Sequence, residues 1–147
     1  MAFAQPPLIQ ILFNTKAPYN IASPTADLAF SAFSAASIAC MREKVATLNS
    51  SRTKLLQVLS TFPDLGAAIG GNEANFLMIP VLAKDGSGKP DSGRAQRVYK
   101  ALAEENGVVV RYRGSELGCE GCLRITVGSE DEHEVVAAKL KSVLEVL

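Results

Sequence analysis

The sequence predicts a mixed α/β (α+β) fold in which helices cover one small sheet. Segments with helical apolar spacing alternate with short apolar runs typical of strands, in the order helix, helix, strand, helix, strand, strand, helix. A chain of 147 residues, 48% hydrophobic and 20% charged, is long and apolar enough to bury a real core. We therefore expect a folded globular chain and not a disordered segment.

The N-terminal part contains an apolar run, a turn and an alanine-rich segment. Residues 7–13 are apolar, and residues 14–24 hold two prolines and two asparagines, which favour an ordered turn. Ser23 followed by Pro24 predicts an N-cap and a first helical position. The helix that starts there is expected to continue to about Cys40.

A second helix, a strand and a third helix are expected next. Apolar residues recur at three- and four-residue steps in residues 41–60, which predicts an amphipathic helix. The apolar run 75–82 predicts a buried strand, and the polar tract 84–93 predicts a surface loop. A helix is expected over residues 94–106, with Gly107 in the left-handed conformation that often ends helices.

The C-terminal third has the clearest local signals. Residues 108–110 are three valines and predict a short strand, and residues 123–127 alternate between apolar and polar, as a half-buried strand does. Ser129 and Glu132 have the spacing of a capping box. An apolar stripe then predicts a final helix that extends to the end of the chain.

Composition and charge exclude several classes of protein. The chain has 15 basic and 15 acidic residues, so it lacks the cationic excess of a general nucleic-acid binder. Residues 1–13 are too short and too interrupted by proline to span a bilayer, and they lack the pattern of a signal peptide. Three cysteines without a disulfide framework favour a reducing, cytoplasmic compartment. We expect neither nucleic acid nor a membrane as a partner.

The spacing of Cys119 and Cys122 suggests a metal or redox site, but the rest of the sequence does not support one. A structural zinc site needs four ligands, and Cys40 and the single His133 form no second pair. A redox pair normally precedes a helix, whereas this one leads into a strand. We expect two structural thiols and no metal, and we expect His133 to be a solvated surface residue at the start of the last helix.

The arginines in the predicted strands allow two interpretations. Arg124 lies in the middle of a strand, and Arg111 follows the three valines with Arg113 two positions later. A guanidinium within a half-buried strand needs a carboxylate, a phosphate or water. The residues alone favour a solvated or ion-paired arginine. The alternative is an anion-binding pair that holds a small acidic ligand.

Three blocks of the sequence resemble histidinol-phosphate aminotransferases, especially the fungal ones. They are AEENGVVVRYRGSELGCEGCLRITVGSEDE (103–132), NTKAPYNIASPTADLA (14–29) and GGNEANFLMIPVL (70–82). The blocks occur in the same order as in that family, and the resemblance covers essentially the whole chain. It implies the small C-terminal domain of a fold type I, pyridoxal-phosphate-dependent aminotransferase, with linking helices and a small mixed or antiparallel sheet.

The resemblance also implies roles for individual residues. Arg124 matches the arginine that binds the substrate α-carboxylate, and Arg111 matches an arginine at the phosphate end of the substrate. Asn75 and Tyr19 are weaker candidates for substrate binding. The substrates implied are histidinol phosphate and glutamate or 2-oxoglutarate, and the complete enzyme is expected to be a homodimer. The association of this chain alone is left open.

The sequence departs from the family at the catalytic lysine. The family forms a Schiff base between a lysine and pyridoxal phosphate, and none of the eight lysines here lies in the matching context. We therefore expect no catalytic residue and no bound cofactor in this chain alone, with residues 1–40 as a linking segment and 41–147 as the small domain. Two alternatives remain: another aminotransferase or decarboxylase of a phosphorylated substrate, and a non-catalytic domain that binds small anions or a protein partner.

Overall fold

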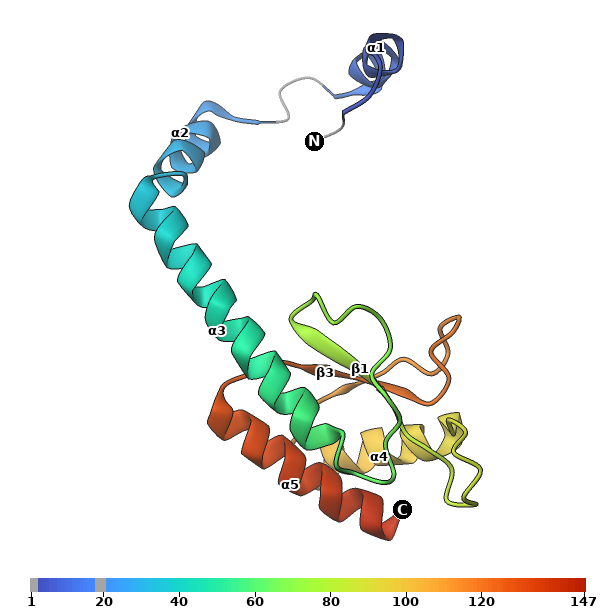
Figure 1. The fold of residues 1–147 in the computed structure, drawn as a ribbon. Helices are drawn as coiled ribbons and strands as arrows, with labels where there is room; N and C mark the ends of the chain where they lie inside the picture. Colours follow the sequence, from blue (N-terminus) through green and yellow to red (C-terminus); the bar gives the residue numbers. More distant parts are fainter. Residues whose placement is uncertain (1–2, 18–20) are drawn as a thin grey trace. The chain divides into compact units, whose positions relative to one another are not determined.

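The computed structural model describes residues 3–17 and 21–147. The helices in these residues are α1 (Pro6–Thr15), α2 (Ser23–Ala32), α3 (Ala35–Leu59), α4 (Ser92–Glu104) and α5 (Glu130–Val146). The strands are β1 (Phe76–Pro80), β2 (Arg111–Tyr112) and β3 (Cys122–Thr126) (Figure 1). The mixed fold class is thereby confirmed. The chain divides into two compact units, Met1–Arg42 and Glu43–Leu147, and the assignment of residues 1–40 and 41–147 to a linking segment and a small domain remains a prediction.

The first unit differs from its predicted helix boundaries. Helix α2 starts at Ser23, one residue before the expected start at Pro24. The N-cap is Ala22, which makes no side-chain hydrogen bond, so the prediction of Ser23 as the N-cap is wrong. The helix also ends at Ala32 and not near Cys40. The cause is Ser34, whose Oγ accepts a hydrogen bond from the backbone N–H of Ser37 at 3.2 Å and so caps α3.

The second unit contains a three-stranded antiparallel sheet in the order β1-β3-β2. Strand β3 is therefore central, and it pairs with β1 from Phe76↔Thr126 to Pro80↔Cys122. The three valines at 108–110 do not form the predicted strand, because pairing with β3 begins only at Arg111. Val108 and Val110 are instead buried in the core, and Val109 is exposed.

Local capping fixes the helices of the second unit. The Asp91 side chain accepts a hydrogen bond from Arg94 N and starts α4 two positions before the predicted residue 94. Gly107 has a φ of 67°, which confirms its left-handed conformation after this helix. Ser129 and Glu132 form the predicted capping box at the start of α5.

The two faces of the sheet have different surroundings. Leu77 and Ile79 of β1 and Leu123 and Ile125 of β3 point into the core, where side chains from the helices bury them. Helices α4 and α5 lie on this same side of the sheet (Figure 1). By strand alternation the middle of the opposite face carries partly or fully exposed side chains, both apolar and polar. Among the described residues, no helix has the length and apolar content needed to cross a bilayer.

Candidate functional site

The sheet face opposite the core brings the two predicted anion-binding residues together. Arg124 of β3 is the direct register partner of Arg111 in β2 and of Met78 in β1. With Phe76 these residues form what we call the arginine face: Phe76, Met78, Arg111 and Arg124. Side chains opposite each other in an antiparallel pair have Cβ atoms about 4.5–5.5 Å apart, and like charges there repel. The face therefore concentrates positive charge.

No acidic side chain of the described residues neutralises the arginine face. The ion pairs in this part of the chain are Lys54–Glu130, Arg94–Asp64 and Arg113–Glu116. Arg113 is thus ion-paired, as one of the two interpretations of the sequence expected. Arg111 and Arg124 have no acidic partner. All fifteen acidic residues lie in the described ranges, so an ion pair does not explain Arg124.

The side chain of Arg124 lies over an aromatic ring. Its Cζ is 5.2 Å from the centroid of the Phe76 ring, within the range of a cation–π interaction. Its Nε is buried and has no hydrogen-bond partner among the described residues. The residue as a whole is half-buried, and Nε is its only nitrogen that is fully buried without a partner among the described residues.

The weaker candidates do not join this pair. Asn75 is exposed and lies in the bend before β1, where its backbone carbonyl accepts a hydrogen bond from Val127 N at 2.9 Å. Alternation along the strand gives no reason to place its side chain on the arginine face. Tyr19 lies outside the described residues. Both remain predictions.

The cysteine pair lies at the entry to β3. Cys122 is fully buried, and burial, with a smaller effect of nearby Cys119, raises the pKa of its thiol to about 11. A thiol that stays protonated at neutral pH is a poor nucleophile and metal ligand. Cys119 is half-buried and unpaired. No group of three or more His, Cys, Asp or Glu side chains in the described residues is placed to hold a metal.

Gly121, between the two cysteines, has a structural role. Its φ is 66°, and a Cβ at this position would lie 2.9 Å from both Asp91 N and Val81 O. Its N–H donates to Ser92 Oγ at 2.9 Å, and its carbonyl accepts from Val81 N at 2.9 Å. Only glycine fits this conformation and this close approach. The turn joins the start of β3 to the start of α4.

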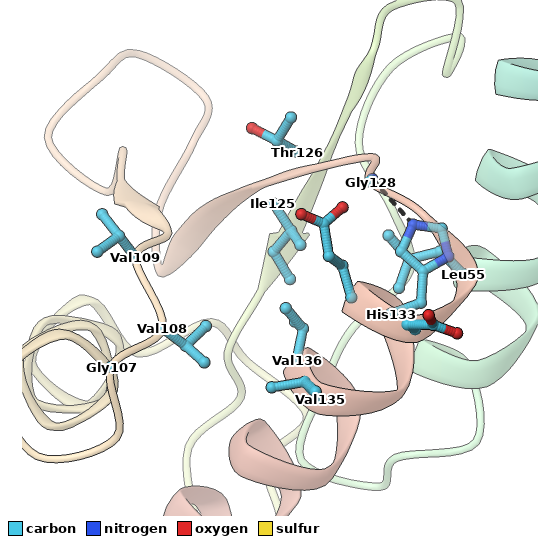
Figure 2. A pocket seen from close by; sticks show the side chains of 12 residues that line it. Leu55, Gly107, Val108, Val109, Ile125, Thr126, Gly128, His133, Val135 and Val136 are labelled. Atoms are coloured by element: carbon cyan, nitrogen blue, oxygen red, sulfur yellow. Dashed lines mark hydrogen bonds between the residues drawn. The ribbon is translucent and has the colours of Figure 1, made fainter.

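The expectation for His133 is wrong: the side chain is buried. Its Nε2 accepts a hydrogen bond from Gly128 N at 3.0 Å, which ties the first turn of α5 back to the end of β3 (Figure 2). Desolvation lowers the pKa of His133, and Glu132 and Glu130 oppose this shift. The histidine borders a hollow of about 420 Å³ lined mainly by apolar side chains such as Val108, Ile125 and Val136.

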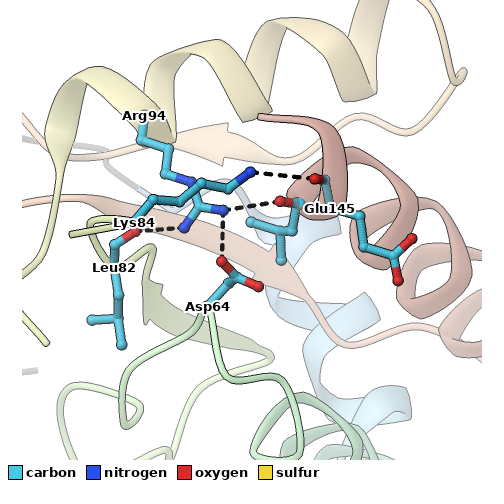
Figure 3. A network of polar contacts seen from close by, with 6 residues as sticks. Asp64, Leu82, Lys84, Arg94 and Glu145 are labelled. Carbon is cyan, nitrogen blue, oxygen red and sulfur yellow. Dashed lines mark hydrogen bonds and ion pairs between the residues drawn. The ribbon is translucent and has the colours of Figure 1, made fainter. Parts of the chain in front are cut away.

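Arg94, on α4, is a second important arginine that the sequence analysis missed. Its side chain is 1% exposed and donates to Leu82 O at 2.6 Å, Asp64 Oδ1 at 2.6 Å and Leu144 O at 2.9 Å (Figure 3). These contacts join four segments of the second unit. The sequence held one indication that Arg94 is buried. The residue precedes Ala95 and lies four positions before Val98, on the side of α4 that faces the core.

Comparison with known proteins shows the family. Residues 1–140 match the family model described as aminotransferase class I and II. The chain is 42% identical to histidinol-phosphate aminotransferase from Schizosaccharomyces pombe and 37% identical to that from Saccharomyces cerevisiae. These matches cover 95% and 98% of this chain, but 36% of each relative.

Solved structures agree in fold. A decarboxylase from Sulfurospirillum multivorans matches with a TM-score of 0.75 at 21% identity, over 94% of this chain and 36% of that one. Histidinol-phosphate aminotransferase from Sinorhizobium meliloti, solved with pyridoxal-5'-phosphate, matches with a TM-score of 0.70 at 18% identity, over 96% and 35%. At these identities the likeness concerns the fold alone. The resemblance inferred from the sequence is confirmed: the chain belongs to the class I and II aminotransferase family and spans about a third of the length of the curated relatives it matches.

Proposed function

We propose that this chain is the substrate-recognition part of a histidinol-phosphate aminotransferase. The complete enzyme would exchange an amino group between histidinol phosphate plus 2-oxoglutarate and imidazole acetol phosphate plus glutamate. Support comes from the fungal relatives of that name, which match nearly the whole chain. We also propose that the complete enzyme is a cytoplasmic homodimer, and the three free cysteines support the reducing compartment.

The observation that carries the proposal is the direct register of Arg111 and Arg124. Two unneutralised guanidinium groups on neighbouring strands are unfavourable until an anion lies between them. Carboxylates and phosphates accept paired N–H bonds from such groups. Because the two arginines lie opposite each other, we favour one anionic group bound by both. The alternative, in which Arg124 binds a carboxylate and Arg111 binds a phosphate at the other end of the substrate, is less favoured. That group would be the phosphate of histidinol phosphate in one half of the reaction and a carboxylate of glutamate in the other.

The described residues do not fit a covalent attachment of the cofactor. Pyridoxal phosphate would supply the electron sink for amino transfer in the complete enzyme. A lysine that forms a Schiff base is normally activated by desolvation or a neighbouring charge. All eight lysines of this chain are exposed, and Lys54 pairs with Glu130. We therefore assign to this chain the binding and orientation of the substrate, and no step on the cofactor.

Calorimetry with histidinol phosphate tests the proposal. The chain should bind it, and Arg124→Ala should weaken binding at least about tenfold, since hydrogen bonds to charged groups contribute about 1.5–3 kcal/mol. Arg113→Ala is the matched control, because Arg113 lies two residues beyond Arg111 but pairs with Glu116. No binding at millimolar ligand, or equal losses in the two variants, would contradict the proposal.

The second candidate function is that of another enzyme acting on a phosphorylated amine, which the fold match to a decarboxylase keeps open. The arginine pair alone would serve either enzyme, because it recognises the anion and not the imidazole. Comparing histidinol phosphate with O-phosphoethanolamine, which keeps the amine and the phosphate but lacks the imidazole, separates the two. Tighter binding of histidinol phosphate supports imidazole recognition by this chain, and equal binding leaves only the shared aminoalkyl phosphate specified here.

A further inference from the structure

We propose that Phe76 is a positioning residue for Arg124: its ring holds the guanidinium so that the two Nη groups, and not Nε, meet the substrate anion. This inference deepens the proposed function and rests on it for the identity of the anion. It concerns the geometry of the site, and the stacking it invokes can be measured without any ligand.

The strand register places Phe76 within reach of Arg124. Phe76 pairs with Thr126, and Met78 pairs with Arg124, so Phe76 is the diagonal neighbour of Arg124 on the same face. Diagonal neighbours lie about 7–8 Å apart, close enough for a long side chain and an aromatic ring to touch. The distance of 5.2 Å from Arg124 Cζ to the ring centroid shows that they do.

The hydrogen-bonding state of the guanidinium gives its orientation. Of the three nitrogens, only Nε is fully buried without a partner among the described residues, and the side chain as a whole is half-buried. Burying a donor without an acceptor is unfavourable, so other contacts must hold the group in this pose. The Phe76 ring is the contact that does so. An anion approaching from solvent can then meet the two Nη groups together, in the end-on bidentate geometry.

An aromatic ring is well suited to this task because it orients a cation without neutralising it. A carboxylate in place of Phe76 would form an ion pair with Arg124 and compete with the substrate anion for the same N–H groups. The quadrupole of a ring attracts the guanidinium but leaves its net charge in place. The Arg124 guanidinium thus keeps a fixed orientation and its full positive charge. The Arg124 side chain therefore loses less conformational freedom when the anion binds.

The test follows the Arg124 Nε–Hε resonance by NMR in the full 147-residue chain. In the wild type we expect an upfield ring-current shift and slow exchange with solvent. Phe76→Leu should abolish the shift, and Phe76→Tyr should restore it. Phe62→Leu is the control, because Phe62 packs against the core and not on the arginine face, so the same change removes a ring elsewhere. A resonance that is unshifted in the wild type, or unchanged in Phe76→Leu, would overturn the inference.

Titration of the same variants with histidinol phosphate links the stack to binding. Phe76→Leu should weaken binding about twofold to fivefold, the range expected for an exposed cation–π contact, with Phe76→Tyr and Phe62→Leu close to the wild type. Equal affinity of Phe76→Leu and wild type would overturn the positioning role. If the wild type shows the ring-current shift but binds no histidinol phosphate, the contact between Phe76 and Arg124 is confirmed and the proposed function is contradicted. Failure of this inference and failure of the proposed function are therefore distinguishable.

Discussion

Two arginines of the second unit show how the same side chain can serve the fold or serve a ligand. Arg94 is buried on the core side, and the chain supplies it with the carbonyls of Leu82 and Leu144 and the carboxylate of Asp64. Arg124 lies on the opposite face of the sheet, where the described residues supply a ring and no acceptor. Arg94 Nε is also buried without a partner among the described residues, so the difference lies in the Nη atoms. The chain supplies acceptors to the Nη atoms of Arg94, and the described residues supply none to those of Arg124.

The difference has a physical consequence for each residue. A buried cation that is paired within the chain contributes little beyond an apolar residue, yet removing it leaves its acceptors without a partner. A half-buried guanidinium without an acceptor adds little to the fold, and its hydrogen-bond donors are free for another molecule. Stability should therefore depend on Arg94, and ligand binding should depend on Arg124.

Arg94→Met should cause the largest effect, a loss of about 3–5 kcal/mol in the free energy of unfolding, as expected when one partner of a buried pair is removed. Urea denaturation measures it. Arg97→Met is the control, because Arg97 lies on the exposed side of the same helix and should change stability by less than about 0.5 kcal/mol. Equal effects at the two positions would show that the buried contacts of Arg94 do not matter.

Gly121→Ala tests the turn on which both arginines depend, since Gly121 contacts the N-terminus of α4 and precedes β3. A left-handed alanine costs about 1–2 kcal/mol, and the approach of 2.9 Å to Asp91 N and Val81 O adds to this. Gly118 has a similar φ of 73°, but an added Cβ would meet nothing within 4 Å. Gly118→Ala should therefore lose only the free energy that a left-handed alanine costs. Thermal unfolding of both variants measures the difference, and equal losses would exclude the close approach as a cause.

His133 should make stability depend on pH at the other end of β3. Because desolvation lowers its pKa in the folded chain below the usual 6.5, its contribution is present above pH 6.5 and is lost as the pH falls through the lowered value. The loss should reach about 1 kcal/mol, the worth of its hydrogen bond from Gly128. Unfolding free energies at pH 7.5 and 5 for wild type and His133→Gln measure it. An identical pH dependence in the two proteins would rule out His133 as the titrating group.

Arg124→Met should have the smallest effect on stability, within about 0.5 kcal/mol. The variant loses the contact with Phe76, but it also loses the unpaired buried Nε and the repulsion from Arg111. Urea denaturation beside Arg94→Met gives the direct contrast. A loss comparable to that of Arg94→Met would mean that Arg124 serves the fold, and the comparison between the two arginines would fail.

Much of the fold was predictable because its signals are local. The alternation around Arg124, the capping box at Ser129 and the left-handed Gly107 each depend on a few neighbouring residues. The strand expected at 108–110 was wrong because β-propensity does not say where a partner strand begins. The helix break before Ala35 was missed because a serine within an alanine-rich segment is a weak stop signal until its cap is seen.

The candidate site was predictable residue by residue but not as an arrangement. The sequence and the family resemblance pointed to Arg111 and Arg124, and the register that places them opposite each other came only from the structure. Arg94 and His133 were misjudged because their environments come from residues distant in sequence or from the fold of a turn. Asn75 and Tyr19 remain predictions that rest on the resemblance alone.

An NMR titration of the isotope-labelled chain with histidinol phosphate tests the central claim most directly. The backbone amides of Arg111, Arg124 and Phe76 should shift together in a saturable manner, while that of Arg94 should stay in place, and Arg124→Met should remove the response. Shifts confined to Gly128, Val108 and Val136 would place the ligand in the hollow beside His133 instead. That result would contradict the account.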